Sequence, residues 1–313
     1  MFWSLLLAGL LSQVDVKPLR ETAPEAHQTD DPAVWVNRKD RSQSLILGTV
    51  KMAAPDGAVA VYRLDGSRLM TIPNVDRPNN IDVAYGVRLG QRKLDIAVAT
   101  ERNKNQLRIF EVVPGVGLRD LASIPVFAQP MGIALYKRKR DGAIFAIVSR
   151  KTGHSGSYLH QYQIKDDGTG KLVGVKVREF GAFSGSKEIE AIAVDAQREE
   201  IYYSDEGAGI RKYSADPSRN DELALFAQSG WVGDREGLAV AGDYLIATDQ
   251  QPANSVFHVF HTKTLKQIGS FRLGADTTDG IDVNQELDLF VAMNDSKHNF
   301  LVASWKSILA ALR

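Results

Sequence analysis

The chain has 313 residues, of which 44% are hydrophobic and 24% are charged, as in an ordinary globular protein. Lysine plus arginine and aspartate plus glutamate number 38 each, so the net charge is zero and does not favour nucleic acid or an anionic membrane as a partner. The absence of cysteine excludes disulfides, thiolate nucleophiles and cysteine-ligated zinc sites.

The first predicted element is an apolar run over residues 2–11, which has the length of a signal-peptide core and is too short to span a bilayer. It has no basic residue ahead of it and no clear small-x-small cleavage site. We expect residues 1–25 to form a signal peptide and N-terminal extension, and the protein to be secreted or periplasmic. The alternatives are a buried N-terminal strand and an uncleaved anchor. No other long apolar run follows, so we expect no integral membrane domain.

Short apolar strands beside acidic or amide residues recur about every 45 to 55 residues, which is the repeat length of β-propeller blades. The six segments are residues 30–35, 79–83, 130–134, 188–192, 234–238 and 278–282. In a propeller the first strand of each blade lines the central channel, so we expect the leading residues of these segments to meet at one mouth.

Two further strand-like runs follow each of these segments, separated by turn residues. The first set of runs covers residues 44–49, 94–99, 144–148, 200–203, 244–248 and 287–292. The second set covers residues 57–62, 107–112, 159–164, 209–213, 255–260 and 300–305. The only helix candidate is the tail over residues 307–312. The sequence therefore predicts an all-β, six-bladed β-propeller over residues 26–313, with four strands in each blade.

Carboxylates stand at equivalent positions of several repeats: Asp30, Asp31, Glu190, Asp205, Glu206, Asp234, Glu236 and Asp279. Acids that meet at one mouth repel one another and stay ionised only beside cations, so the pattern favours a bound metal. Calcium accepts six to eight oxygen ligands at flexible distances, which separate blades can supply without an EF-hand loop. The alternative is that these acids only mark the turns that precede strands.

Basic residues follow the second strand of the first three repeats, at Lys51, Arg102 and Lys151. Their position predicts that they lie on the same face as the acids, where they would suit a phosphorylated small-molecule substrate. The histidines show no metal-ligand or triad pattern, and no G-x-S-x-G motif or Gly-rich phosphate loop is present. The best nucleophile on offer is therefore a metal-activated water.

The ordered set of motifs resembles the β-propeller phytases, calcium-dependent enzymes that hydrolyse phosphate monoesters of myo-inositol hexakisphosphate (phytate). The matching stretches are residues 30–37, 57–66, 77–82, 148–153, 190–206, 234–238 and 276–283, followed by Asn299, Phe300 and Trp305. They occur in the order found in that family and cover nearly the whole chain after about residue 25.

The resemblance implies a metal-rich site at one end of the channel. It implies that the calcium ligands or water-positioning acids are Asp30, Asp31, Glu190, Glu206, Asp234, Glu236, Gln250 and Asp279. Four of them are expected to take part in catalysis, namely Glu190, Glu206, Asp234 and Glu236. Lys51, Arg102 and Lys151 would bind phosphate and neutralise charge while a calcium-bridged water attacks phosphorus.

The chain departs from the family pattern in two respects. Met131 replaces the usual tyrosine, and the segments after Gly237 and Val283 are compact, which would open the site or change which inositol phosphate fits. Two other functions stay open: a calcium-dependent propeller lactonase or esterase, which has little need for three cations, and a non-catalytic binding scaffold. Because a closed propeller has no free sheet edge, we expect a monomer.

Overall fold

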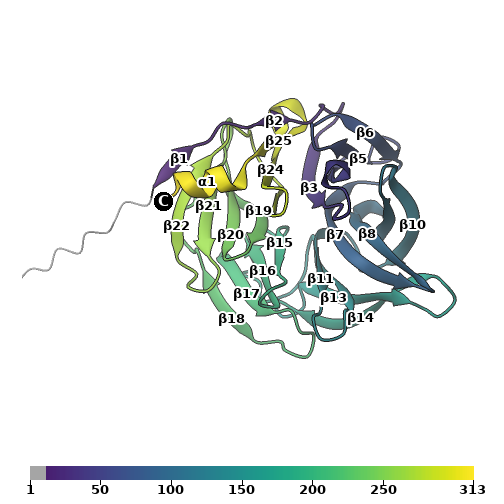
Figure 1. Cartoon of the computed structure of the whole chain (residues 1–313). Coiled ribbons are helices and arrows are strands. Elements are labelled where there is room, and N and C mark those ends of the chain that lie inside the picture. Colours follow the sequence, from purple (N-terminus) through teal and green to yellow (C-terminus); the bar gives the residue numbers. More distant parts are fainter. Residues whose placement is uncertain (1–11) are drawn as a thin grey trace, which may run out of the picture.

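The computed structural model describes residues 12–313. Within this range the strands form six sheets arranged radially around one axis (Figure 1). The innermost strands are β3 (Thr29–Trp35), β7 (Pro78–Leu89), β11 (Pro130–Lys137), β15 (Ile192–Asp195), β19 (Asp234–Ala241) and β23 (Ile281–Asn284). Each of them contacts the next, and β23 contacts β3, which closes the ring. The sheets are the blades of a six-bladed β-propeller, as the sequence predicts.

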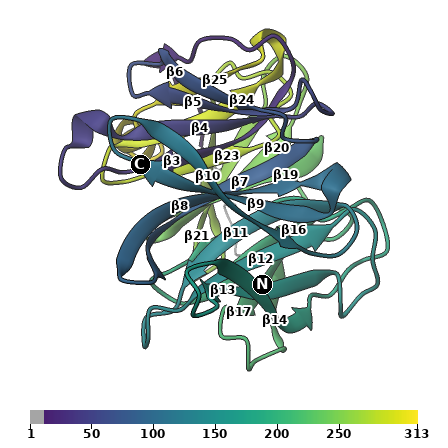
Figure 2. The same ribbon diagram turned by 90° about the vertical axis from the view of Figure 1, so that its right-hand side faces the viewer.

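The first three blades each contain four antiparallel strands in chain order from the axis outward. Blade 1 continues from β3 with β4 (Leu45–Val50), β5 (Ala58–Arg63) and β6 (Arg68–Pro73). Blade 2 continues from β7 with β8 (Arg92–Glu101), β9 (Gln106–Val113) and β10 (Gly117–Pro125). Blade 3 continues from β11 with β12 (Ile144–Arg150), β13 (Leu159–Asp166) and β14 (Leu172–Phe180). Blade 2 is at the right in Figure 1 and faces the viewer in Figure 2.

Blades 4 and 5 repeat this order, and blade 6 takes its outermost strand from the N-terminal part of the chain. Blade 4 continues from β15 with β16 (Glu200–Asp205), β17 (Gly209–Ser214) and β18 (Glu222–Phe226). Blade 5 continues from β19 with β20 (Tyr244–Gln250), β21 (Val256–His261) and β22 (Gln267–Arg272). Blade 6 continues from β23 with β24 (Leu289–Asn294) and β25 (Asn299–Ala303).

Two short strands near the N-terminus complete the last two blades. β2 (Arg20–Glu21) pairs antiparallel with β25, and β1 (Gln13–Asp15) pairs parallel with β22. The sequence predicts a signal peptide and extension up to residue 25, whereas residues 13–15 and 20–21 are strands of blades 5 and 6. The predicted signal-peptide core over residues 2–11 lies outside the described residues.

The hydrophobic core lies between the blades. Six clusters of buried apolar side chains each combine residues of two neighbouring blades, one cluster for every interface around the ring. This distribution follows from strands whose alternate side chains face the sheets on either side, so each blade is packed on both faces. Burial of these side chains, rather than any single contact, fixes the positions of the blades.

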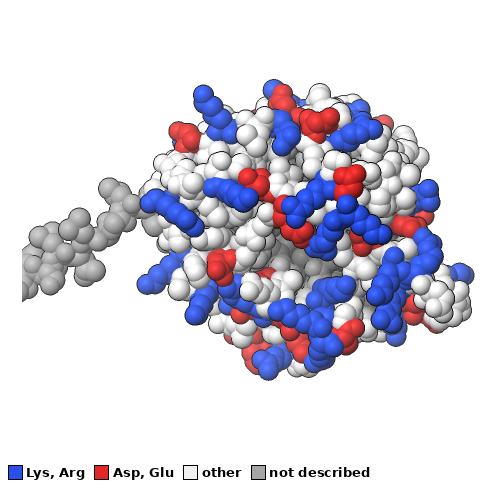
Figure 3. Space-filling model, in the orientation of Figure 1, with Lys and Arg blue, Asp and Glu red and all other residues white. Residues whose placement is uncertain are grey.

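The helix α1 (Trp305–Ala311) follows β25 and begins after Ser304, whose side chain accepts a hydrogen bond from the backbone N–H of Ser307. Its Trp305 and Ile308 side chains pack into the core between blades 5 and 6. Figure 3 shows the face on which α1 lies, where basic and acidic side chains are mixed around a central hollow. No helix of residues 12–313 is long and apolar enough to cross a membrane.

Candidate active site

The innermost strands carry a β-bulge near the end opposite α1. The pairing of β3 with β4 is interrupted between Thr29 and Pro32, and β7, β11 and β19 are interrupted at the corresponding place. In blades 4 and 6 the strand begins just after that place, so the strands predicted from residues 188 and 278 start later, at Ile192 and Ile281. A bulge bends the strand and redirects its side chains. Two successive residues lie at this place in each blade. We call the first of the two, taken over all six blades, the inner ring: Asp30, Asn79, Met131, Glu190, Glu236 and Asp279.

In blades 3, 5 and 6 the residue after the inner-ring residue is a glycine that packs closely against the next blade. A Cβ atom at Gly132 would lie 1.6 Å from the carbonyl oxygen of Glu190, and one at Gly280 would lie 2.2 Å from the carboxylate of Asp31. Only glycine permits such an approach of one backbone to its neighbour. These close contacts hold the inner-ring segments of adjacent blades at fixed distances.

The second strand of each blade ends at the same mouth. Its last or next residue forms what we call the outer ring: Lys51, Arg102, Lys151, Glu206, Gln250 and Asp295. A hydroxyl residue before the outer ring links neighbouring blades: Thr49 accepts a hydrogen bond from the backbone N–H of Asp31 (3.0 Å) and donates to the carbonyl of Asn79 (2.6 Å). Thr100 makes the equivalent bonds between blades 2 and 3. The outer ring is cationic in blades 1–3 and carries acids and an amide in blades 4–6.

The side chain of Lys51 connects the two rings. Its ammonium nitrogen lies 2.8 Å from Asp30, 3.3 Å from Glu190 and 3.8 Å from Asp279. Asn79 donates a hydrogen bond to the same oxygen of Glu190 at 3.1 Å, and Gln250 donates one to Asp279. Residues of blades 1, 2, 4, 5 and 6 therefore meet around one small cavity.

A second acidic group adjoins this cavity. The carboxylate oxygens that Glu206, Asp234 and Glu236 can offer to a metal all lie within 4.8 Å of one another. We call these three residues the acidic triad. The Oε1 atom of Glu206 is buried and has no hydrogen-bond partner, and Lys187 forms an ion pair with Asp234. Closely spaced oxygen ligands of this kind are those that calcium prefers.

The pKa values of three acids of the site are raised, chiefly by burial, whereas that of Glu190 is lowered. Burial and the neighbouring Glu188 and Glu190 raise the pKa of Glu206 to about 8. Burial, with the carboxylates nearby, also raises the pKa of Glu236 well above its usual range, and burial raises that of Asp279 to about 6 although Lys51 opposes it. Burial opposes ionisation of Glu190 too, but Lys51, Asn79 and Lys151 outweigh it and lower its pKa.

The cationic half of the mouth contains residues beyond those singled out in the sequence. Lys151 lies 2.5 Å from the carboxylate of Glu188. The guanidinium groups of Arg77 and Arg102 lie near each other. Burial and this like-charged neighbour lower the pKa of Arg102. Both arginines are half-buried, and neither forms a salt bridge among the side chains of residues 12–313.

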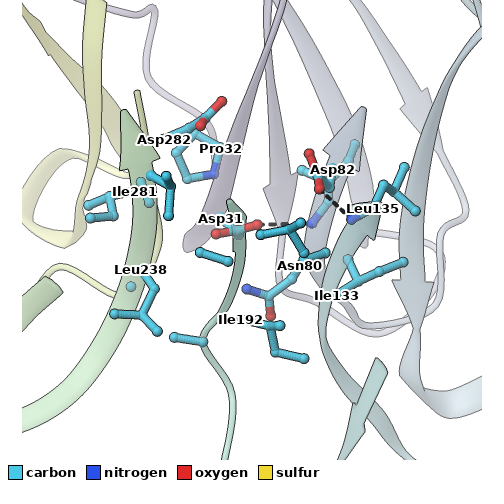
Figure 4. A pocket seen from close by; sticks show the side chains of 18 of the residues that line it. Asp31, Pro32, Asn80, Asp82, Ile133, Leu135, Ile192, Leu238, Ile281 and Asp282 are labelled. Carbon is cyan, nitrogen blue, oxygen red and sulfur yellow. Dashed lines mark hydrogen bonds between the residues drawn. The ribbon is translucent and has the colours of Figure 1, made fainter. Parts of the chain in front are cut away.

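Asp31 faces away from this cluster, into the central channel (Figure 4). Its carboxylate accepts a hydrogen bond from the backbone N–H of Ile81 at 3.0 Å. Asp82 bonds the N–H of Leu135 in the same way, and Asp282 bonds that of Val34, so each carboxylate joins its blade to the next. The channel cavity between them has a volume of about 180 Å³.

The structure thus brings most of the predicted site residues together. Asp30, Glu190, Glu206, Asp234, Glu236, Gln250 and Asp279 lie in or beside the two acidic groups, with Lys51, Arg102 and Lys151 near them. Asp205 instead pairs with Arg211 at 2.9 Å. Four residues of the site, Asn79, Glu188, Lys187 and Arg77, were not proposed as ligands or substrate contacts from the sequence. The position of Asn79 in the repeat could have identified it, because it is equivalent to Asp30 and Glu190.

A family model for phytases matches residues 8–312. The chain belongs to the phytase family. The 3-phytase of Bacillus subtilis (strain 168) is 28% identical to this phytase-family protein over 332 residues, covering 92% of this chain and 83% of that protein. The crystal structure of the computationally designed protein Ika8 covers 89% of this chain and 72% of its own, with a TM-score of 0.45 and 12% identity.

Proposed function

We propose that this protein hydrolyses phosphate monoesters of phytate, with calcium held by its acidic residues. The observation that carries the proposal is the division of one mouth into two halves. Lys51, Arg102 and Lys151 form the cationic half, while the acidic triad occupies the other. A polyanionic substrate requires fixed positive groups for its phosphates, whereas the acids require further cations before such a substrate can approach.

The basic residues would bind and orient the reacting phosphate. Arg102 can offer paired N–H donors to two phosphate oxygens, and the ammonium groups of Lys51 and Lys151 act as point charges. As the bond to the leaving oxygen lengthens, negative charge spreads over the oxygens of the phosphoryl group, and fixed cations stabilise that charge. All three residues stand at strand ends, where the bulged and hydrogen-bonded frame limits their movement.

The acidic residues fit calcium. Asp30 Oδ2 and Glu206 Oε1 are buried without a hydrogen-bond partner, and burial together with neighbouring carboxylates raises the pKa values of Asp30, Glu206 and Glu236. The residues that would hold the ions are Glu206, Asp234, Glu236, Asp30, Glu190, Asp279 and the amide oxygen of Gln250. Calcium bound there would supply positive charge for the phosphate and lower the pKa of a coordinated water.

We propose that Glu190 receives a proton from the attacking water. Its pKa is lowered, so it is ionised at neutral pH, and its position beside Lys51 and Asn79 fixes its orientation. A general base needs an ionised carboxylate within reach of the water. Glu190→Gln should therefore lower kcat by a factor of about 100 or more in protein that is still folded at the assay temperature.

The test is phosphate release from phytate and from p-nitrophenyl phosphate, each with calcium and with excess chelator. We expect release from phytate only when calcium is present, and loss of release in Lys151→Ala. Activity that persists in chelator would contradict the metal requirement. Hydrolysis of lactones or carboxylic esters in place of phosphate esters would favour the esterase alternative, and no hydrolysis of any of these substrates would favour the scaffold.

We further propose that the protein is exported and works as a monomer. The apolar core over residues 2–11 supports export, and N-terminal sequencing of the mature protein tests it. The closed ring of blades supports a monomer, because every blade packs against two others and only the outermost strand of each blade has a free edge. Sedimentation velocity at several protein concentrations tests the second proposal.

A further inference from the structure

The segment over residues 181–191, which joins β14 to β15, places two adjacent residues of opposite charge against the two halves of the mouth. Lys187 forms an ion pair with Asp234 of the acidic triad. The next residue, Glu188, lies 2.5 Å from Lys151 in the cationic half. Each half of the site is thus in contact with a charge of the opposite sign from the same short segment.

The backbone of this segment is fixed by bonds to blade 4. Ser184 donates two hydrogen bonds to Asp205, from its backbone N–H at 2.8 Å and its hydroxyl at 2.6 Å. The carbonyl of Glu188 accepts a hydrogen bond from the N–H of Glu206 at 3.2 Å. Lys187 has a φ of 58°, in the left-handed region that side chains other than glycine seldom adopt. This turn lets the side chains of Lys187 and Glu188 diverge.

Lys187 contacts the acidic triad, which has few positive charges near it. Among the salt bridges of residues 12–313, Lys187 provides the only one to a member of the triad. Glu206 Oε1, in the same triad, is buried and has no hydrogen-bond partner. The Lys187 side chain is 47% exposed and belongs to no hydrophobic cluster of the described residues, so it does not pack in the core.

We propose that Lys187 and Glu188 are internal counterions that compete with the ligands of the site: Lys187 with a divalent cation at the acidic triad, and Glu188 with a phosphate at Lys151. The proposal rests on the proposed function, because it takes the triad as a calcium site and Lys151 as a phosphate contact. A cation that binds Asp234 must displace the ammonium of Lys187, and a phosphate that binds Lys151 must displace the carboxylate of Glu188. Both residues therefore lower the affinity of the site for its ligands.

The first experiment measures calcium binding by isothermal titration calorimetry on metal-free protein, without substrate. Lys187→Met keeps the length of the side chain and removes its charge, and we expect it to bind calcium about fivefold more tightly than the wild type, as the loss of a partly exposed ion pair implies. Lys187→Arg should bind calcium like the wild type, because it retains the charge. The matched control is Lys263→Met, which removes a lysine from the turn between β21 and β22, at the other end of blade 5.

A double-mutant cycle with Asp234→Asn separates the direct contact from the general effect of charge. If Lys187 competes through Asp234, the gain from Lys187→Met should largely disappear in the Asp234→Asn background. A gain of the same size in both backgrounds, or in Lys263→Met, would overturn the proposal. If the wild type binds calcium and Lys187→Met binds it with the same affinity, the proposal is overturned as well, while the proposed function stands. If no variant binds calcium, the proposed metal site itself fails.

The second experiment uses inorganic phosphate as the probe for Glu188. We expect Glu188→Gln to lower the inhibition constant of phosphate about threefold or more, with calcium saturating. The control variant is Glu222→Gln, which removes an acid from β18, in the same blade but paired with Arg211. Phosphate inhibition that is unchanged or weaker in Glu188→Gln would show that Glu188 does not compete with phosphate, and would overturn this half of the proposal.

Discussion

Lys51 is a buried lysine that forms salt bridges with three carboxylates, and its own side chain is only 15% exposed. Because Asp30, Glu190 and Asp279 come from three different blades, one ammonium group joins segments that are far apart in the sequence. The removal of one partner from a buried ionic group leaves the remaining charges uncompensated. The residue therefore contributes to stability as well as to the proposed phosphate site.

We predict that Lys51→Met lowers the free energy of unfolding of calcium-free protein by about 3 kcal/mol. Calcium should offset most of this loss, because it can replace the missing positive charge. Urea unfolding in chelator and in calcium measures both values. Lys39→Met, at an exposed position without a salt bridge among the described residues, is the control and should have no measurable effect. An equal loss with and without calcium would contradict the explanation.

The channel carboxylates predict a pH dependence of stability. Burial, with Asp82 nearby, raises the pKa of Asp282 to about 7, so the folded protein holds this proton more tightly than the unfolded chain does. The contribution of Asp282 to stability is thus complete below about pH 4 and decreases as the pH rises towards 7, by up to about 4 kcal/mol.

Comparison with Asp282→Asn isolates this effect, because asparagine does not titrate. In chelator, the free energy of unfolding of the wild type minus that of Asp282→Asn should fall between pH 4 and pH 7. Asp221→Asn, at an exposed loop position, provides the baseline. A difference that stays constant or rises with pH would refute the prediction.

At the scale of elements, the inner-ring bulges position the site. Gly132→Ala should place a Cβ against the carbonyl of Glu190 and so displace Glu190, at a cost of about 1–3 kcal/mol. We expect phosphate release to fall by more than the loss of stability explains. Gly274→Ala is the comparison: it has a positive φ of 75° but no atom near the added Cβ, so it should lower stability without a loss of activity in the folded protein. Equal activity in both variants would argue against the role of the close contact.

The sequence predicted the three inner strands of every blade but did not locate the fourth. The inner strands are buried and read as apolar runs, whereas β6 and β18 are largely exposed or half-buried and lack a continuous apolar signal. The strands β1 and β2 are short and pair with segments more than 250 residues away, a relationship that no local pattern contains. The residues of the site could be predicted from the sequence because they repeat at equivalent strand ends. The direction of the Asp31 side chain could not be predicted, because it depends on how a bulge turns two successive residues.

The N-terminal strands give a further prediction. A chain that starts at residue 12 retains both strands and should melt like the full-length protein. A chain that starts at residue 26 lacks β1 and β2, so β22 of blade 5 and β25 of blade 6 lose their outer partners. Its melting temperature should be lower and its tendency to aggregate higher. Thermal melts and light scattering of the two chains measure this. Identical melting curves would show that the two strands do not stabilise the ring.

For the whole molecule, the proposed calcium site would couple calcium binding to global stability. An ion that binds only the folded state stabilises it by about 2.7 kcal/mol at a concentration one hundred times its dissociation constant. We predict that the melting temperature rises with calcium concentration and that magnesium has a smaller effect, because magnesium requires a tighter octahedral arrangement of ligands. The variant Asp234→Asn should show a smaller rise. A melting curve indifferent to calcium would count against a metal site at this mouth.

The pairing of β2 with β25 also determines when the ring can close during synthesis. The first of these strands leaves the ribosome early, and its partner is among the last segments to be made. Until then the newborn protein has an open arc of blades, with the apolar faces of its first and last sheets exposed to water. A nearly finished chain would therefore be prone to association with its neighbours until the C-terminal strand is released.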